Sequence, residues 1–143
     1  MRISTKGRYS LEALLYMVLL RDGDYASTRT ISKNTGISDG YLEQLFTPLR
    51  KAGILQGIRG PRGGYLLGKA PDKISVGDIL RAVEGPLEPV DCVGLKYCPA
   101  QDGCISRHTW RDLYEGITDC VDSISLADLV EAYYAMDKME YMI

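Results

Sequence analysis

Two short helical patterns separated by a single glycine, within residues 27–53, restrict the fold more than any other feature of the sequence. Ser27 or Thr28 is suited to cap the first pattern, because a side-chain oxygen can accept a hydrogen bond from the first helical turn. Gly36 ends that pattern, since a residue without Cβ adopts the left-handed turn at no steric cost. Ser38 then caps a second pattern with apolar residues at helical spacing. This arrangement is typical of a helix-turn-helix.

Regular elements are expected on both sides of this motif. Apolar residues recur at i, i+3, i+4, i+7 and i+8 between about residues 8 and 21, which predicts a helix with one buried face. Beyond the motif, strand-like runs at 54–58 and 65–67 flank residues 59–64, a loop of Gly, Pro and Arg. The loop predicts a β-hairpin, or wing, because Gly and Pro are suited to tight turns. A further helix is expected over residues 75–85.

Pro48 lies inside the second helical pattern of the motif. Proline has no backbone N–H, and its ring crowds the carbonyl four residues earlier, which here belongs to Gln44. We therefore expect this helix to bend or to be shortened near Gln44.

The C-terminal part of the chain shows two further patterns. Pro86 and Pro89 open an irregular stretch that holds three of the four cysteines. From about residue 104 a helical pattern returns, with apolar residues at alternating spacings of three and four, as in a helix that packs lengthwise on another helix. These apolar residues are Trp110, Leu113, Ile117, Val121 and Ile124. Cys120 of the same helix is expected to be a small core residue.

Together these patterns predict a mainly α-helical chain with a small β-hairpin wing. Its 143 residues are about one domain's worth. We expect a winged helix-turn-helix domain at 1–85, a cysteine-bearing loop at 86–104, and a long dimerisation helix with a C-terminal segment at 105–143.

The two halves of the chain differ in charge. Residues 1–70 carry eleven Lys and Arg against five Asp and Glu, whereas residues 71–143 carry six against fourteen. The overall net charge of −2 hides this contrast. A basic N-terminal half indicates a surface for a polyanion, and with the helix-turn-helix it favours double-stranded DNA.

The helix that begins after Ser38 exposes short polar and planar groups, which can pair with base edges in the major groove. Gln44 is suited to adenine, and Glu43 is suited to the amino group of cytosine. On the wing, Arg59 and Arg62 are suited to phosphates or to a narrow minor groove. The candidate DNA-binding residues are Arg2, Lys6, Arg8, Thr28, Arg29, Ser38, Tyr41, Glu43, Gln44, Arg50, Lys51, Arg59 and Arg62. The alternative is a protein-docking module with a solvated charged face.

No export signal is expected from the N-terminal residues. An apolar run at 13–20 follows basic residues, but it gives way to charged residues without a small-residue cleavage site and is too short to span a bilayer. We therefore expect a cytoplasmic protein that does not bind a membrane. In that reducing compartment, cysteines serve as ligands or reactive thiols before they form disulfides.

Cys92, Cys98 and Cys104 lie in the irregular stretch with five residues between neighbours. Thiols on such a backbone can converge on one soft metal centre. His108 lies four residues beyond Cys104 and would share its helix face if the helix has already begun. Three thiolates and an imidazole suit an iron–sulfur cluster or a zinc site. A redox-active disulfide and three unrelated cysteines are the alternatives.

Four segments of the chain resemble one family of known proteins. They are Met1–Tyr9, Tyr41–Phe46, the wing Arg59–Gly68, and Trp110–Leu113. Together they closely resemble the bacterial winged-helix regulators of the IscR, NsrR and CymR family, over roughly residues 1–130. The resemblance implies a homodimeric transcription regulator whose long helix crosses that of its partner.

In the IscR and NsrR branches, the resemblance implies an iron–sulfur cluster that changes DNA affinity in response to iron–sulfur status, redox state or nitric oxide. Its cysteine ligands correspond to Cys92, Cys98 and Cys104. The IscR pattern has a histidine where this chain has Arg107, so the neighbouring His108 is the candidate fourth ligand. Arg8 stands where the NsrR pattern has an acidic ligand, which weakens the nitric oxide interpretation. We expect a 2Fe-2S cluster, with a 4Fe-4S cluster as the alternative.

In the cluster mechanism, release of the cysteine loop would change the separation of the two DNA-binding heads, and so the fit to half-sites one helical turn apart. Two other mechanisms stay open. The cysteines could form a metal-free thiol switch, or a protein partner could control the chain, as the CymR branch implies. Enzyme activity is not expected, because one histidine with no phosphate loop, triad or carboxylate pair forms no catalytic constellation.

Overall fold

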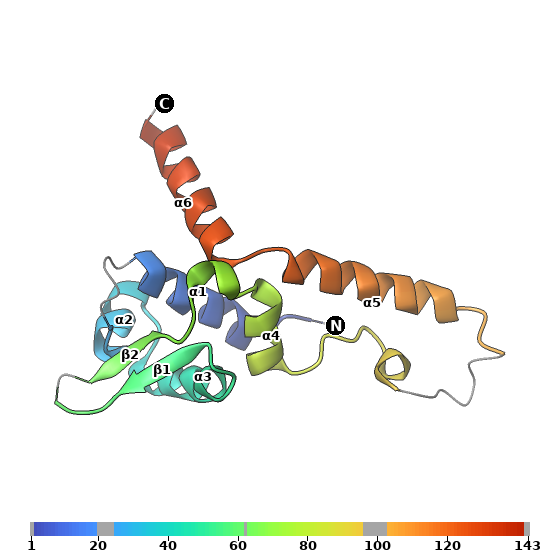
Figure 1. The fold of residues 1–143 in the computed structure, drawn as a ribbon, viewed down its shortest axis with the longest axis horizontal. Helices are drawn as coiled ribbons and strands as arrows, with labels where there is room; N and C mark the ends of the chain where they lie inside the picture. The colour runs from blue at the N-terminus through green and yellow to red at the C-terminus, as the bar shows by residue number, and fades with distance from the viewer. Residues whose placement is uncertain (1, 20–24, 62, 96–102, 142–143) are drawn as a thin grey trace.

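The computed structural model describes residues 2–19, 25–61, 63–95 and 103–141, and it confirms the predicted mainly helical fold with a small wing (Figure 1). Helices α1 to α4 and a two-stranded hairpin form a head, from which α5 and α6 extend in different directions (Figure 1). The elements are α1 (Thr5–Leu19), α2 (Thr28–Thr35), α3 (Asp39–Lys51), β1 (Leu55–Ile58), β2 (Gly64–Leu67), the 3-10 helix η1 (Pro71–Lys73), α4 (Val76–Glu84), the 3-10 helix η2 (Asp91–Gly94), α5 (Arg107–Asp122) and α6 (Leu126–Tyr141).

The helix-turn-helix forms as its capping residues predict. Ser27 precedes α2 and accepts a hydrogen bond from the Thr30 backbone N–H at 3.1 Å. Gly36 ends α2 in the left-handed conformation, with a φ of 78°. Ser38 caps α3 by accepting a hydrogen bond from the Tyr41 backbone N–H at 3.3 Å. Local sequence therefore decides where both helices begin and where α2 ends.

The larger of two hydrophobic clusters holds the helices of the head together. Its side chains come from α1 to α4 and from the segments around the wing. The fully buried members include Leu14, Ile31, Leu42, Phe46, Leu49, Ile74 and Ile79, each 0% exposed. Because α3 inserts one whole face into this core, its opposite face is left exposed to solvent.

Helix α1 begins at Thr5 and not near residue 8 as its apolar pattern predicts. The physical reason is a cap supplied by Glu84 at the end of α4. Its Oε1 accepts hydrogen bonds from the backbone N–H groups of Ser4, at 2.8 Å, and of Gly7, at 3.0 Å. These groups have no partner within the helix, so a distant carboxylate extends α1 toward the N-terminus.

Helix α3 is not shortened by Pro48, because it continues for a further turn to Lys51. The Pro48 carbonyl accepts a hydrogen bond from the Ala52 backbone N–H at 3.0 Å, so the helical pattern resumes after the proline. Leu45 and Leu49 on either side are buried in the core. Tertiary packing therefore overrides the local preference to end the helix at this point.

The wing is held against the segment that leads into α2. Strands β1 and β2 pair antiparallel, with Leu55 opposite Leu67. Ala26 and Tyr65 exchange both of their backbone hydrogen bonds, each at 2.8 Å. The close approach requires Gly64, since a Cβ at this position would lie 2.5 Å from the Ala26 carbonyl oxygen. The wing therefore has a fixed position relative to the helix-turn-helix.

The C-terminal region forms two helices, α5 and α6. Helix α5 ends at Asp122, so the prediction that Ile124 lies on the long helix is wrong. The Ile124 carbonyl accepts a hydrogen bond from the Val76 backbone N–H at 2.8 Å, which holds the link between the helices beside the start of α4. Leu126 at the start of α6 is 0% exposed and belongs to the head core. This backbone pairing across the fold interrupts the helical pattern.

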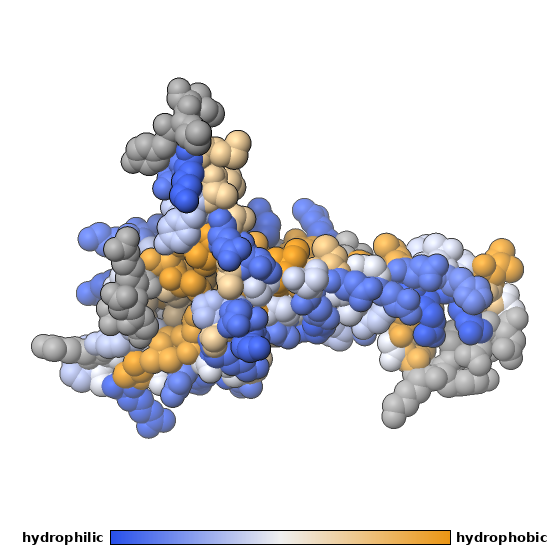
Figure 2. All heavy atoms as spheres, turned by 45° about the horizontal axis from the view of Figure 1, so that its top comes forward, coloured by the Kyte–Doolittle hydropathy of each residue, from blue (hydrophilic) through white to orange (hydrophobic). Residues whose placement is uncertain are grey.

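The surface of the molecule is unevenly covered by apolar residues. On the face in Figure 2, apolar side chains gather over the head below α6, and hydrophilic side chains cover much of the arm formed by α5. Ile117 and Val121 of α5 pack against the head, on a cluster of Val76, Leu80 and Leu87. Within the described ranges, no helix has the length and apolar character needed to cross a membrane.

Candidate DNA-binding surface and cysteine loop

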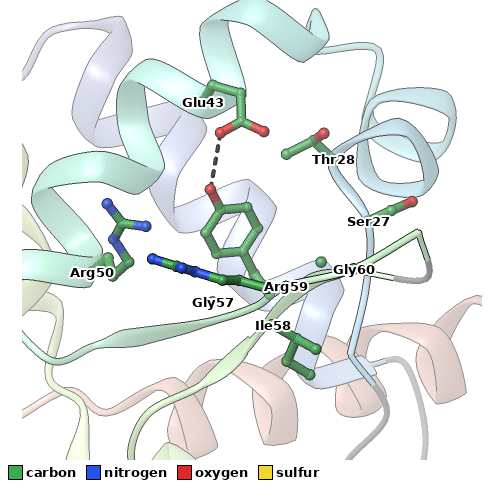
Figure 3. A pocket seen from close by; sticks show the side chains of 11 residues that line it. Ser27, Thr28, Glu43, Arg50, Gly57, Ile58, Arg59 and Gly60 are labelled. Atoms are coloured by element: carbon green, nitrogen blue, oxygen red, sulfur yellow. Dashed lines mark hydrogen bonds between the residues drawn. The ribbon is translucent and has the colours of Figure 1, made fainter.

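Helix α3 and the wing enclose an open cleft of about 500 Å³, which also includes the start of α2 (Figure 3). Glu43 and Arg50 reach it from α3, Arg59 from the wing, and Thr28 from α2. Two guanidinium groups and a hydroxyl therefore line a surface whose walls come from α3, the wing and the start of α2. Such groups are suited to the phosphates of a polyanion, and the exposed polar face of α3 lies beside them.

The base-reading candidate Glu43 is joined to the wing by Tyr65. The Tyr65 hydroxyl donates a hydrogen bond to Oε2 of Glu43 at 2.9 Å (Figure 3). Burial raises the pKa of Tyr65, and the hydrogen bond to Glu43 and the negative charge of Glu43 raise it further, against the opposing charge of Arg50. Tyr65 therefore remains a hydrogen-bond donor at neutral pH.

Helix α1 contacts the reading helix through aromatic and hydroxyl groups. The hydroxyl oxygens of Thr5 and Tyr41 lie 3.1 Å apart. The rings of Tyr9 and Tyr41 meet edge to face, with centroids 5.9 Å apart. The Arg8 guanidinium lies over the Tyr9 ring, 5.8 Å from its centroid. These contacts bring the basic start of α1 to one end of α3.

Most of the other candidate DNA-binding side chains are exposed. Gln44 is exposed on α3 beside Glu43, whereas Thr28 is half-buried. Ser38 is exposed, but its hydroxyl already serves as the cap of α3. The exposed basic residues in this set are Arg2, Lys6, Arg8, Arg29, Arg50, Lys51 and Arg59. Arg62 lies outside the described residues.

Sequence reasoning missed two residues of this surface, Tyr65 and Glu84. Tyr65 has a recognisable signal, because it is an aromatic residue on a strand directly after the glycine-rich tip. Glu84 has none, since its partners Ser4 and Gly7 are 80 and 77 residues away. Burial raises the pKa of Glu84, but hydrogen bonds from Ser4 and Gly7 outweigh it and the pKa is lowered. The carboxylate that caps α1 is therefore ionised at neutral pH.

The described cysteines of the loop lie on either side of its central part. Cys92 is on η2, and Cys104 lies two residues before the N-cap of α5. Both are free and half-buried, and η2 packs against α5. Cys98 lies outside the described residues. Among those that are described, no group of three or more His, Cys, Asp and Glu residues is arranged to hold a metal ion.

Sequence spacing places His108 on the same helix face as Cys104 only if the helix has begun by Cys104. In the structure α5 begins at Arg107, so the two residues do not share a helix face. The argument for a shared face is therefore wrong, although His108 is exposed on the first turn of α5. A hydrogen bond with the Ser106 hydroxyl, with further backbone contacts and the charge of Arg107, lowers the pKa of the Cys104 thiol against a small opposing effect of burial. Trp110 donates from its indole N–H to the same Ser106 hydroxyl at 2.9 Å.

Helix α5 exposes part of its apolar pattern. Leu113 is 46% exposed and Trp110 is half-buried, whereas Ile117 and Val121 pack against the head. Cys120 is exposed, so the prediction of a core position for it is wrong. Successive residues of a helix point about 100° apart, and Val121 takes the face that packs on the head. The free face of α5 therefore begins near Cys120 and includes Leu113.

The fold and this surface can now be compared with known proteins. Residues 3–132 match the Rrf2 family, which is described as iron-dependent transcriptional regulators. The chain belongs to the Rrf2 family. It is a transcriptional regulator of the IscR and Rrf2 type, and membership of this family implies DNA as its partner. The resemblance inferred from the sequence is thereby confirmed.

Similar members of the Rrf2 family include proteins of two branches. The IscR transcriptional regulator of Erwinia tasmaniensis is 44% identical over 130 residues, which cover 91% of this chain and 79% of that protein. The structure of CymR, the global cysteine regulator of B. subtilis, has a TM-score of 0.75 and 37% identity, covering 92% of this chain and 98% of that one. The structure of T. potens IscR has a TM-score of 0.73 and 34% identity, covering 93% and 88%.

Proposed function

We propose that this chain is a cytoplasmic homodimer whose affinity for double-stranded DNA is set by an iron–sulfur cluster. The proposed cysteine ligands are Cys92, Cys98 and Cys104. The observation that carries the DNA-binding part is the cleft between α3 and the wing, where Arg50 and Arg59 lie beside the exposed polar face of α3. The high identity to IscR relatives supports the cluster part.

Sequence-specific binding follows from the exposed face of α3. In this proposal α3 enters the major groove, where Gln44 and Glu43 read base edges. Arg50 and Arg59 contact the sugar–phosphate backbone from the cleft, which positions the protein without reading sequence. The basic start of α1 adds phosphate contacts beside Tyr41, since the hydroxyl of Thr5 lies 3.1 Å from that of Tyr41.

A homodimer would form along α5. This helix extends away from the head (Figure 1), and its free face carries Leu113, which is 46% exposed. A second copy packed on that face would cover Leu113 together with Trp110. A two-fold dimer then presents two α3 helices to half-sites about one turn of DNA apart.

The described cysteines fit the proposed ligand role in their chemistry. Cys92 and Cys104 are free thiols. Cys92 lies on η2, which packs on α5, and Cys104 lies three residues before the start of α5. Thiolates are the usual ligands of iron–sulfur clusters. A bound 2Fe-2S or 4Fe-4S cluster would supply a centre whose charge and integrity depend on redox conditions. His108, on the first turn of α5, is the proposed fourth ligand.

The chain itself links the loop to the head at both ends of α5. The loop starts directly after α4, and η2 rests against α5. At the other end of α5, Asp122 forms an ion pair with Arg81 of α4. A change in the position of the loop would therefore move α5 relative to the head. In a dimer this alters the separation of the two α3 helices and so the affinity for an operator.

The decisive experiment is a visible absorption spectrum with iron and sulfide analysis on protein purified without oxygen. We expect visible absorption with stoichiometric iron and sulfide, which are lost in Cys92→Ala and retained in Cys120→Ala. His108→Ala should keep the iron but change the spectrum. Colourless protein without iron after anaerobic reconstitution would contradict the cluster proposal. Gel-shift titration of the same preparations tests whether DNA affinity follows the iron content.

A regulator without a cluster is the second candidate, favoured by the structural likeness to CymR over 98% of the length of that protein. Its cysteines would act as a reversible thiol switch, or a protein partner would control DNA binding. Thiol counting with and without oxidant distinguishes the switch from a cluster protein. A variant with Cys92, Cys98 and Cys104 all replaced by Ala, and unaltered DNA regulation, would favour control by a partner.

A further inference from the structure

The contact between Glu43 and Tyr65 joins the reading helix to the wing inside the cleft. Glu43 is exposed on α3, and a glutamate at such a position ordinarily samples several rotamers. Here its Oε2 accepts the hydrogen bond from Tyr65 at 2.9 Å (Figure 3). In the part of the chain that the structure describes, no ion pair joins Glu43 to Arg50 or Arg59, although both line the same cleft. Tyr65 is therefore the group that orients this carboxylate.

Tyr65 is itself held from two directions. Its backbone exchanges two hydrogen bonds of 2.8 Å with Ala26, next to the cap of α2. Its ring meets that of Phe46 edge to face, with centroids 4.9 Å apart, and Phe46 is fully buried in the core. These contacts therefore fix the position of the Tyr65 phenol oxygen relative to the head before any DNA is bound.

This arrangement leaves Glu43 with a defined acceptor for DNA. Oε2 accepts the hydrogen bond from Tyr65. Within the described residues the other oxygen, Oε1, has no hydrogen-bond partner, so its lone pairs are available for a base edge. An ionised carboxylate only accepts hydrogen bonds, so it favours a base donor and is repelled by base acceptors and by phosphates. A Glu43 carboxylate held in one orientation faces one operator position. Its preference for a hydrogen-bond donor then applies to the base at that position.

We propose that Tyr65 is a specificity-determining positioning residue, whose hydroxyl holds the Glu43 carboxylate against the wing so that α3 presents a fixed acceptor to the major groove. The inference rests on the proposed function, because it assumes that α3 reads DNA. Tyr65 acts through Glu43 and need not touch a base itself. A free carboxylate could turn away from an unfavourable base, and the penalty against the wrong operator would become smaller.

The test is a double-mutant cycle read as base preference. DNA duplexes are selected from a random library with the wild-type chain purified without oxygen, and affinities are then measured for the best duplex and its single-base variants. Base discrimination by the wild type and by Tyr65→Phe is compared at the operator position where Glu43→Ala changes the base preference. Tyr65→Phe keeps the ring and its contact with Phe46 and removes only the donor. We expect it to lower discrimination at that position about tenfold.

The double-mutant cycle shows whether Tyr65 acts through Glu43 or contacts DNA directly. In the Glu43→Ala background, Tyr65→Phe should cause no further change in base preference. An equal effect of Tyr65→Phe in both backgrounds would overturn the proposal, because Tyr65 would then contact DNA on its own. Unchanged discrimination in Tyr65→Phe, with discrimination altered in Glu43→Ala, would overturn it too while leaving the proposed function intact.

Two further variants distinguish loss of the contact between Tyr65 and Glu43 from a general effect on folding. Glu43→Asp keeps the charge but withdraws the carboxylate from Tyr65 by one methylene, so it should reproduce the loss seen in Tyr65→Phe. Tyr133→Phe removes a phenol hydroxyl from α6, away from the cleft, and should leave base preference unchanged. If the wild-type chain selects no preferred duplex at all, the proposed function fails, which is a different outcome from any of those above.

Discussion

Arg81 of α4 and Asp122 at the end of α5 form a bidentate ion pair, with Nη1 to Oδ1 at 2.7 Å and Nη2 to Oδ2 at 2.9 Å. The hydrogen bond from Arg81 holds the pKa of Asp122 below its ordinary value, against a small opposing effect of burial. Two parallel hydrogen bonds restrict orientation as well as distance. The pair therefore sets the direction in which α5 leaves the head.

Removing the charge of Asp122 should change operator spacing more than stability. Asp122→Asn loses the ionic contact, but the two side chains are 35% and 40% exposed, so we expect a loss of less than about 1 kcal/mol in the free energy of unfolding. The proposed dimer should then tolerate half-sites moved closer or further apart. Binding to duplexes of altered half-site spacing measures this. Asp119→Asn, on an exposed residue of α5, is the control, and an unchanged spacing preference in Asp122→Asn would contradict the prediction.

A side chain at position 77 should destabilise the junction between α4 and α5. A Cβ on Gly77 would overlap the Asp122 carboxylate and lie 2.8 Å from Nη1 of Arg81. Relative to Gly40→Ala, we expect Gly77→Ala to lower the free energy of unfolding by less than about 1 kcal/mol, because the atoms that must move are the ends of two partly exposed side chains whose ion pair is disturbed. Gly40→Ala is the control, because Gly40 also lies in a helix and has no heavy atom within 4 Å of its added Cβ. Urea denaturation measures both, and equal stabilities would count against this packing.

The cap that Glu84 provides for α1 should depend on pH. Its folded pKa is lowered below the ordinary value of 4.5, because hydrogen bonds from Ser4 and Gly7 outweigh the effect of burial. The stabilisation is therefore fully present above the unfolded pKa and is lost as the pH falls below about 4.5 toward the lowered folded pKa. Glu84→Gln should cost about 1 kcal/mol at neutral pH. It should also flatten the acid limb of the stability curve.

Urea denaturation at pH 7 and at about pH 3.5 tests this cap. The wild-type chain should lose more stability between the two than Glu84→Gln does. Glu12→Gln, which alters an exposed carboxylate of α1, should follow the wild type. Parallel curves for Glu84→Gln and the wild type would show that the hydrogen bonds to Ser4 and Gly7 contribute nothing to stability.

Arg59 and Gln44 should affect DNA binding in different ways. Arg59→Ala removes a cleft cation that contacts phosphates in our proposal, so affinity should fall similarly for all operators. The salt slope should decrease by about 1 for each subunit, which is about 2 for the proposed dimer. Gln44→Ala should instead relax base preference at one position. Titrations at several salt concentrations distinguish the two. Arg111→Ala removes the same charge from exposed α5 and is the control; an equal effect of this variant would indicate a general charge effect.

Local chemistry made the helix-turn-helix and the wing predictable from sequence. Two caps and one left-handed turn, at Ser27, Ser38 and Gly36, depend on groups within three or four residues. They can therefore be predicted from short stretches of sequence. The exposed reading candidates Glu43 and Gln44 followed from the same periodicity, because the buried face of α3 leaves them on the opposite side.

Contacts between distant residues could not be predicted in this way. Glu84 extends α1 through partners 77 and 80 residues away, and Ile124, predicted to lie on the long helix, instead pairs with Val76 after α5 has ended. Cys120 is predicted to lie in the core because free cysteines are usually buried, but the sequence does not show which face of α5 the head covers.

The sequence alone predicts the helix-turn-helix, the wing, the family, and the residues that carry charge, thiols and base-reading groups. Which of these groups meet was visible only once the chain was folded: Tyr65 contacts Glu43, and Arg81 contacts Asp122. The physical reason is that caps, turns and amphipathic faces depend on interactions between residues close in sequence. The two pairs depend instead on how whole helices pack, and many weak contacts contribute to that packing at once.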